Sequence, residues 1–206
     1  MKEPDPRLRI DGEFRLEDVS RAFLRGDTVK AARGLIGAWI ARRHKGHWYG
    51  ARIVETEAYL GRHDPAAHSY GGRRTPRVEP MYRDGGHLYV YLVYGLHHCA
   101  NVVTGTEGVA EAVLLRAAEG PEGTPEKLLS GPGRLCRALG ITTAASGLDL
   151  LAGGELRLAR GPGRPRAIRA TPRIGVDYAG EAARWPLRFF DARSRAVSGP
   201  ARLNRA

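Results

Sequence analysis

The fold is decided by a stretch that reads ARIVETEAYLG (51–61), HDPAAHSYGGRRTPR (63–77), HLYVYLVYGLHHCANVV (87–103) and EAVLLRAA (111–118). In it, runs of β-branched and aromatic residues alternate with Gly, Pro and Asp, which is the pattern of short strands joined by turns. The same stretch holds the densest collection of Glu, His and Tyr in the chain. We therefore expect the two ends of the protein to act mostly as scaffold for it.

Two hairpins are predicted from this pattern. The clearer one joins its strands through a connection that begins at Tyr94, and it places Tyr89 and Tyr91 on one face. A third strand follows it and ends at Arg116. The other hairpin lies just upstream and turns at 44–46. The four hairpin strands are expected at 35–42, 48–60, 88–93 and 98–103.

Outside the hairpins, helices are predicted at 16–26 and within LLSGPGRLCRALGI (128–141), where Pro132 suits the first turn and Gly140 the C-cap. Residues 61–80 contain too much Gly, Pro and Arg for regular structure, and a long loop inside a compact domain is often functional. Further strands are expected at 155–160, around 171–176 and at 186–190.

These elements indicate an α+β fold: one mixed domain with a curved, mostly antiparallel sheet and a few helices. The chain has 206 residues and no internal repeat, which suits one domain with a real hydrophobic core. We expect residues 1–15 to be a loose N-terminal lead-in and residues 16–206 to form the single domain.

The composition disfavours a membrane or secreted protein. No apolar run approaches the roughly 18 residues of a membrane span. The N-terminus, MKEPDPRLRIDGEF (1–14), has charges and prolines where a signal peptide needs an apolar core. We expect a cytoplasmic protein, associated with the nucleoid if the source is bacterial, with no membrane partner.

Metal and Schiff-base chemistry are also disfavoured. Cys99 and Cys136 lie far apart in no paired spacing, which favours two reduced, buried thiols. His97 and His98 adjoin Cys99, but neighbouring residues of a strand point to opposite faces and rarely bind one metal ion. No lysine occurs at 46–126, so no amine for a Schiff base is available there. We expect no metal site and no cofactor.

The charge is the first indication of a partner. Lys and Arg number 33 against 22 Asp and Glu, a net charge of +11, which favours a polyanionic partner and nucleic acid before membrane. All but four of these cations are arginine, a side chain suited to bidentate phosphate contacts. A compositional habit of the genome explains much of the Arg/Lys ratio, but it does not explain the net charge.

Two carboxylates in the strand at 48–60 are candidates for catalysis. Ile53, Glu55, Glu57 and Tyr59 fall at alternate positions and would share one face of a regular strand. A strand Glu is most often a surface residue or half of an ion pair. A desolvated one can act as a base toward water near neutral pH. The spacing leaves Glu55 and Glu57 as equal candidates.

Aromatic and cationic residues add a second group of candidates. Tyr59, His68 and Tyr91 are more often core residues when taken singly, but three such rings in a basic protein suit stacking on a nucleic-acid base. Tyr94 has little packing to gain at a hairpin turn and suits a wedge between base pairs. The loop cations suit phosphate contact or a solvated surface about equally; they are Arg73, Arg74 and Arg77.

Seven motifs taken together, from about residue 19 to residue 190, resemble one family. They are RIVETEAYLG, DPAAHSYGGRRTPR, HLYVYLVYG, CANVV, AVLLRA, LSGPGRLCRALGI and RIGVDYAGE followed by PLRFF. In this order they closely resemble the alkyladenine (3-methyladenine) DNA glycosylase family. The resemblance implies a single mixed α/β domain whose β-hairpin is inserted into the minor groove of double-stranded DNA.

The implied activity is that of a monofunctional base-excision repair enzyme without lyase activity, acting as a monomer. It would flip damaged purines such as 3-methyladenine, 7-methylguanine or hypoxanthine out of the duplex. It would then cut their N-glycosidic bond.

The resemblance also implies a role for individual residues. Glu57 matches the general base for the attacking water, Arg116 the arginine that helps to hold this water, and Ile174 the residue whose backbone carbonyl contacts it. Asn101 matches the pocket asparagine that screens purine substituents, and Tyr94 the residue that fills the gap left in the duplex. Tyr59, His68 and Tyr91 match the rings that sandwich the flipped base.

Two other function classes remain open from the residues. A non-catalytic RNA-binding or ribosome-associated module would share the basic charge and the exposed aromatic residues, but it would not need an acid–cation pair such as Glu57 and Arg116. A small-molecule nucleosidase would share the carboxylate and the stacking rings, but it would need neither Tyr94 nor a net charge of +11.

Overall fold

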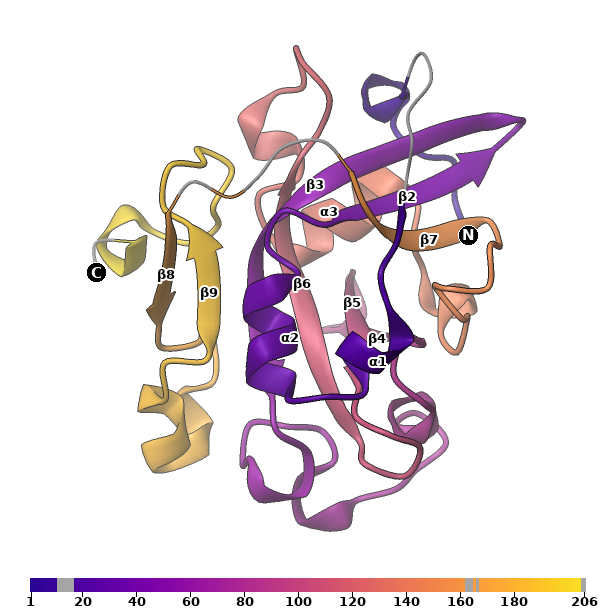
Figure 1. Cartoon of the computed structure of the whole chain (residues 1–206). Helices are drawn as coiled ribbons and strands as arrows, with labels where there is room; N and C mark the ends of the chain where they lie inside the picture. Colours follow the sequence, from indigo (N-terminus) through magenta and orange to yellow (C-terminus); the bar gives the residue numbers. More distant parts are fainter. Residues whose placement is uncertain (11–16, 162–164, 166, 205–206) are drawn as a thin grey trace.

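One sheet is the frame of the molecule. The computed structural model describes residues 1–10, 17–161, 165 and 167–204, and over these residues nine strands form a single antiparallel sheet. Its order is β1-β7-β2-β3-β6-β5-β4, while β9 pairs with β3 and β8 with β9 (Figure 1). The strands are β1 (Glu17–Asp18), β2 (Trp39–His44), β3 (His47–Tyr59), β4 (Leu88–Val93), β5 (His97–Thr104), β6 (Glu111–Glu119), β7 (Leu156–Arg160), β8 (Ile168–Thr171) and β9 (Arg188–Asp191).

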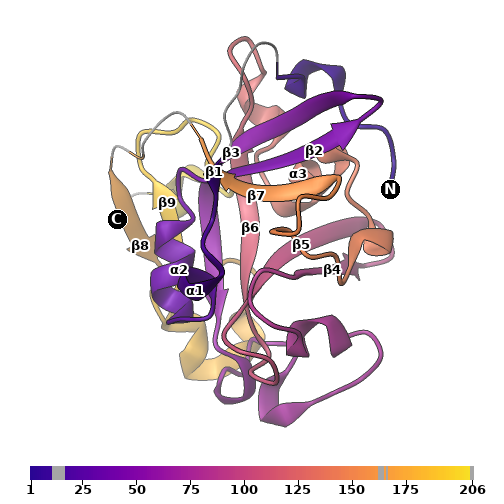
Figure 2. The same cartoon turned by 45° about the vertical axis from the view of Figure 1, so that its right-hand side comes forward.

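Few helices accompany the sheet. They are α1 (Arg21–Leu24), α2 (Thr28–Gly34) and α3 (Pro132–Leu139). The second packs on β3, β6 and β9, and the third on β5 and β6. Figure 2 shows the sheet curling around its long strands, with the β8–β9 hairpin at one side and the β4–β5 hairpin at the other. Short 3₁₀ segments lie at Pro6–Leu8, Gly61–His63, Tyr70–Gly72, Glu79–Tyr82, Glu126–Leu128, Thr143–Ala145, Asp177–Arg184 and Ala201–Asn204.

The predicted α+β class with a curved antiparallel sheet is confirmed. Both predicted hairpins are present as β2–β3 and β4–β5, and β6 follows as the third strand. The end signals of α3 also act as predicted: Pro132 occupies the first turn, and Gly140 caps the helix in the left-handed conformation at φ +65°. None of the helices in the described ranges is long and apolar enough to cross a membrane.

The region before β2 differs from the prediction. The helix expected at 16–26 is only the four-residue α1, preceded by the short β1, and residue 16 lies outside the described part of the chain. The helix α2 was not predicted, although Asp27 caps it by accepting a hydrogen bond from the Lys30 N–H at 2.7 Å. The strand expected from residue 35 begins instead at Trp39, because Gly37 adopts φ +92° and interrupts extended backbone.

The strand expected around 171–176 is displaced. The strand β8 covers Ile168–Thr171 and ends where Pro172, which has no N–H for a ladder, follows. The next residues turn away from the sheet, and Gly175 adopts φ +78°. The segment that carries Ile174 is therefore a loop between β8 and the 3₁₀ segment at 177–184.

An irregularity in β3 corrects the predicted shared face. Val54 is an extra residue on β3, because Ile53 pairs with Ala118 and Glu55 pairs with Ala117. The bulge reverses the alternation. Ile53 therefore lies in the main core, while Glu55, Glu57 and Tyr59 face the other side of the sheet.

The first ten residues contact the body of the protein. The N–H groups of Lys2 and Asp5 donate to the carbonyls of Gly140 and Ala138, and Ile10 donates to Trp48. Leu8 is completely buried in the main core. The proposed domain limit near residue 15 stays a prediction.

Candidate active site

Four adjacent strands place side chains for the site in one row. In the sheet ladders Glu57 of β3 lies opposite Leu114 of β6, Leu114 opposite Asn101 of β5, and Asn101 opposite Tyr89 of β4. Alternate strand residues point to opposite faces of the sheet. Their neighbours accordingly belong to the hydrophobic core on the other face; these are Ala58, Val113, Val102 and Val90.

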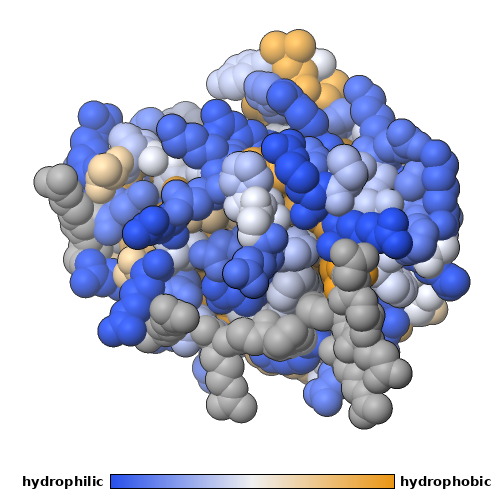
Figure 3. Space-filling view, turned by 90° about the horizontal axis from the view of Figure 1, so that it is seen from above, coloured by the Kyte–Doolittle hydropathy of each residue, from blue (hydrophilic) through white to orange (hydrophobic). Residues whose placement is uncertain are grey.

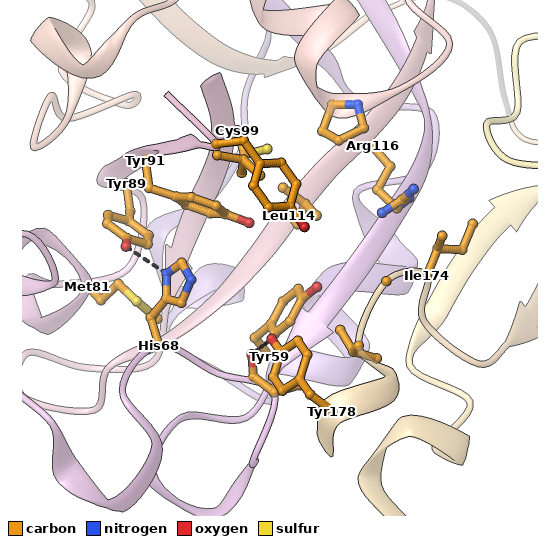
Figure 4. Close-up of a pocket in the computed structure, with 16 residues that line it drawn as sticks. Tyr59, His68, Met81, Tyr89, Tyr91, Cys99, Leu114, Arg116, Ile174 and Tyr178 are labelled. Carbon is orange, nitrogen blue, oxygen red and sulfur yellow. Dashed lines mark hydrogen bonds between the residues drawn. The ribbon is translucent and has the colours of Figure 1, made fainter. Parts of the chain in front are cut away.

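A pocket of about 260 Å³ opens on this face (Figure 4). Its volume is just below the range typical of sites for drug-sized ligands, about 300–1,000 Å³. Five tyrosine rings and one imidazole form much of the wall. The lining residues are Tyr59, Ala66, His68, Met81, Tyr89, Tyr91, Val93, Tyr94, Cys99, Leu114, Arg116, Pro132, Ile174, Gly175, Val176 and Tyr178.

Glu57 lies buried behind this wall and accepts hydrogen bonds from three lining residues. The Tyr59 hydroxyl donates to one carboxylate oxygen at 2.9 Å, and the Ile174 N–H donates to the other at 2.8 Å. The Arg116 guanidinium lies 3.3 Å from both oxygens. All of these partners donate, so both carboxylate oxygens of Glu57 act as acceptors. Among its neighbours, Ile174 contacts it through the backbone N–H.

Glu55 has a different environment, which separates the two carboxylates that the sequence left equal. One of its oxygens accepts from Arg188 Nε at 2.6 Å and from Arg116 Nε at 3.2 Å, and the other accepts from the Ser198 N–H at 2.6 Å. Glu55 and Arg188 are both completely buried. Neither is among the pocket-lining residues. Glu55 therefore links Arg116 to the C-terminal segment.

Across the pocket from Tyr59, the rings of His68, Tyr89 and Tyr91 contact one another. The imidazole of His68 lies 2.8 Å from the Tyr89 hydroxyl and packs edge-on against Tyr91, with ring centroids 4.5 Å apart. Burial lowers the pKa of His68 to about 4, and the positive charges of Arg77 and Arg73 add to this effect. Burial also raises the pKa of Tyr89 to about 12. At neutral pH this wall is therefore uncharged and aromatic.

Tyr59 is held by a buried ion pair. Burial, reinforced by the charge of Glu57, raises its pKa well above the ordinary value, so the hydroxyl remains a donor. The Arg173 guanidinium lies 4.8 Å from the centre of the Tyr59 ring and forms two hydrogen bonds to Asp64, at 2.5 and 2.9 Å. Asp64 also accepts the N–H groups of Leu60 and Ala66. The pair thus fastens the Ile174 loop to the loop that carries His68.

Asn101 is buried but is not among the pocket-lining residues. Its side-chain amide donates to the carbonyls of Tyr89 and Cys99, at 3.1 and 3.4 Å. Asn101 therefore fixes the backbone of two lining residues, Tyr89 on β4 and Cys99 on β5. Its expected role in screening purine substituents stays a prediction.

The tip of the β4–β5 hairpin carries the most exposed large hydrophobic side chain in the described part of the chain. Tyr94 is 92% exposed and adopts φ +50°, and Leu96, two residues on, is 75% exposed. Tyr94 is also one of the residues that line the pocket. The turn therefore holds an aromatic ring in solvent at the pocket mouth, where it adds little to folding stability.

The three loop arginines differ in their environment. All are exposed, but Arg74 is paired with Glu79 at 2.6 Å and lies over the Tyr82 ring. Arg77 lies 5.6 Å from the centre of the Tyr91 ring, directly beside the aromatic wall.

Figure 3 shows another, mainly hydrophilic face of the molecule, in keeping with the net charge of +11. In the described ranges no three His, Cys, Asp or Glu side chains gather as metal ligands.

Comparison with known proteins decides the family. A model of the methylpurine-DNA glycosylase (MPG) family matches residues 22–195. The chain belongs to the methylpurine-DNA glycosylase family. This confirms the resemblance drawn from the seven sequence motifs, and it gives no support to a non-catalytic RNA-binding module.

Three similar curated proteins carry the name "Putative 3-methyladenine DNA glycosylase". The protein from Desulfitobacterium hafniense (strain Y51) is 43% identical over 202 residues, which cover 89% of this chain and 99% of the relative. The protein from Methanocella arvoryzae is 43% identical over 192 residues, covering 87% and 95% of the two chains. That from Bdellovibrio bacteriovorus is 44% identical over 186 residues, covering 84% and 94%.

The structure adds residues to the candidate site that sequence reasoning missed. Tyr89 shares a strand face with Tyr91, so the alternation of β4 could have identified it. The pairing of Asp64 with Arg173 joins residues 109 positions apart, and no local pattern signals such a contact. Tyr178 follows the RIGV motif closely, but its place at the pocket depends on a loop that periodicity does not describe.

Proposed function

We propose that the protein is a monofunctional DNA glycosylase of base-excision repair. It flips alkylated or deaminated purines out of double-stranded DNA and hydrolyses the N-glycosidic bond with a water activated by Glu57. The observation that carries the proposal is a buried carboxylate, paired with an arginine, directly behind an aromatic pocket in a member of this family.

The chemical step needs an oriented water and a negative charge near the sugar. Glu57 takes a proton from the water, and the water oxygen attacks C1′ as the bond to the purine breaks. The negative charge of the Glu57 carboxylate also stabilises the developing oxocarbenium ion. Arg116 and the Ile174 N–H fix the direction of the carboxylate. The Ile174 carbonyl accepts the second hydrogen of the water, as the family resemblance implies.

The aromatic wall binds the extruded base. Tyr59 on one side and the His68–Tyr91 pair on the other offer flat, uncharged surfaces for a purine. Bases alkylated at N3 or N7, such as 3-methyladenine and 7-methylguanine, carry a positive charge that aromatic faces attract. The same charge makes these bases good leaving groups. Hypoxanthine is neutral and needs a proton as it leaves; His68, with a pKa near 4, is not charged to supply it at neutral pH.

Residues at the pocket mouth and on the neighbouring loop hold the duplex. Tyr94 at the hairpin tip enters the minor groove and fills the space that the extruded nucleotide leaves. Arg73 and Arg77 are exposed on the neighbouring loop and contact phosphates, while Arg74 contributes less because Glu79 already pairs with it. The protein acts as a monomer on one lesion.

Incubation with a duplex that contains one lesion tests this proposal. Separate duplexes carry hypoxanthine or 7-methylguanine, and released 3-methyladenine is measured from alkylated DNA. We expect base release, followed by strand cleavage only after alkali, because a monofunctional glycosylase leaves an intact abasic strand. Cleavage without alkali would contradict the monofunctional activity. DNA binding with no base release from any substrate would favour a passive nucleic-acid-binding protein.

A further inference from the structure

Tyr178 is an exposed aromatic residue at the pocket that no step above uses. Its side chain lines the pocket, yet the residue is 71% exposed. A ring so open to water gains little from burial, so packing does not explain a large aromatic side chain here. An exposed ring at the rim of a ligand pocket is instead placed for contact with the ligand.

The ring is held in place although it is exposed. The Tyr178 hydroxyl donates to the carbonyl of Ala66 at 3.3 Å, across from its own segment to the loop that carries His68. Its near neighbours in the chain, Val176 and Ala179, pack with Ala66 in a small buried cluster. Contact with a partner therefore costs little side-chain entropy, as for other rigid tyrosines in binding surfaces.

Its place in the chain indicates which part of the substrate it meets. Tyr178 comes four residues after Ile174, whose N–H is bonded to Glu57. Tyr59 packs against the buried cluster of Ala66, Val176 and Ala179. In the view of Figure 4, Tyr178 and Tyr59 lie toward one side of the pocket and Tyr89 and Tyr91 toward the other. The bond to be cut joins base to sugar. With the base inside the pocket and the duplex outside, the sugar lies between them, on the side where Tyr59 and Ile174 hold Glu57.

We propose that Tyr178 packs against the deoxyribose of the extruded nucleotide and stabilises the flipped state. This proposal rests on the proposed function. Tyr94 would hold the duplex open from within the stack, and Tyr178 would hold the nucleotide that has left it. The contact is with the sugar, so it does not depend on which damaged purine occupies the pocket. It is made only when a nucleotide is extruded, so undamaged duplex does not benefit from it.

The test compares Tyr178→Ala and Tyr178→Phe with wild type. Trp185→Ala is the control, because Trp185 directly follows the same segment, is 36% exposed and is not a lining residue. The substrates are one duplex sequence with hypoxanthine, the same sequence with 7-methylguanine, and the undamaged sequence. A 2-aminopurine beside the lesion reports base flipping by fluorescence. Single-turnover excision over a range of protein concentrations gives the half-saturating concentration and the maximal rate.

For Tyr178→Ala we expect a smaller 2-aminopurine signal and a half-saturating concentration raised roughly 5- to 30-fold for both lesions, from the lower part of the range for ring contacts with nucleotides. Affinity for undamaged duplex should stay within about twofold of wild type, and thermal stability should be unchanged. Tyr178→Phe keeps the ring but loses the hydroxyl bond that positions it, so it should lose much less than Tyr178→Ala.

Wild-type excision must first be present, and its absence would refute the proposed function rather than this contact. Given wild-type excision, normal flipping by Tyr178→Ala, or a loss no larger than that of Trp185→Ala, would overturn the sugar contact. An equal loss of affinity for undamaged duplex would also overturn it. If Tyr178→Phe were as impaired as Tyr178→Ala, the effect would belong to the hydroxyl bond with Ala66 and not to the ring.

Discussion

Replacing Glu55 by Gln should lower the unfolding free energy of the protein without abolishing base excision. Glu55 accepts hydrogen bonds from Arg188, Arg116 and the Ser198 N–H, and it is completely buried. The negative charges of Glu55 and Glu57 balance the positive charges of Arg116 and Arg188. Glutamine keeps the shape but leaves one buried positive charge without compensation.

The cost of breaking a buried ion pair in this way is about 3–5 kcal/mol of unfolding free energy. For a domain of this size, each 1 kcal/mol lowers Tm by about 2–4 °C. The expected fall in Tm is therefore roughly 6–20 °C. Excision by the folded variant, well below its Tm, should fall by less than about tenfold, because Glu57 and its hydrogen-bond partners are retained.

Thermal and urea unfolding of Glu55→Gln measure the first effect, and single-turnover excision measures the second. The matched control is Glu79→Gln, which removes an exposed ion pair with Arg74 and should leave Tm nearly unchanged. A Glu55→Gln variant with normal stability and a 100-fold loss of excision would refute this reasoning, because it would make Glu55 the residue that acts on the water.

Three further predictions address the DNA-binding residues and the aromatic wall. Tyr94→Ala should weaken binding to lesion duplex while changing unfolding free energy by about 0.5 kcal/mol or less; a loss of about 3–5 kcal/mol, as for a buried aromatic residue, would contradict the exposed tip. In a log–log plot, affinity for duplex DNA should fall with salt by about 0.9 per phosphate contact, and Arg73→Ala and Arg77→Ala should each reduce that slope by about one contact; a flat salt response would exclude these contacts. The pKa of His68 is lowered on folding, from 6.5 to about 4, so the unfolded chain binds the extra proton and the stability that His68 contributes should be lost as pH falls from about 6.5 to 4. An NMR titration should find the imidazole neutral at pH 6, and a folded-state pKa near 6.5 would disagree with its burial.

Local signals in the sequence predicted much of the fold. The β4–β5 hairpin follows from β-forming residues on both sides of Tyr94-Gly95, and α3 follows from a proline at its start and Gly140 at its end. By contrast, α2 is seven residues long, and most of its stability comes from packing on β3 and β6 rather than from its own pattern.

The candidate site was predictable only in part. The types and order of Glu57, Tyr59 and Tyr91 were visible as alternation along two strands, but the bulge at Val54 changes which residues share a face, and alternation alone does not signal a bulge. The different environments of Glu55 and Glu57 depend on contacts with residues more than 100 positions away. Glu55 contacts Arg188 and Ser198, and Glu57 contacts Ile174. Such contacts are set by how the sheet folds back on itself.

The central claim is that Glu57, and no other carboxylate, activates the water. Glu57→Gln keeps the shape and one acceptor oxygen but cannot take a proton. Single-turnover excision and a gel-shift titration on the same hypoxanthine duplex measure its effect, with Glu55→Gln as the neighbouring control. We expect excision to fall at least about 100-fold, with binding to the lesion duplex kept or tightened because a negative charge is removed. Near-normal excision by Glu57→Gln, or equal losses in the two variants, would contradict the claim.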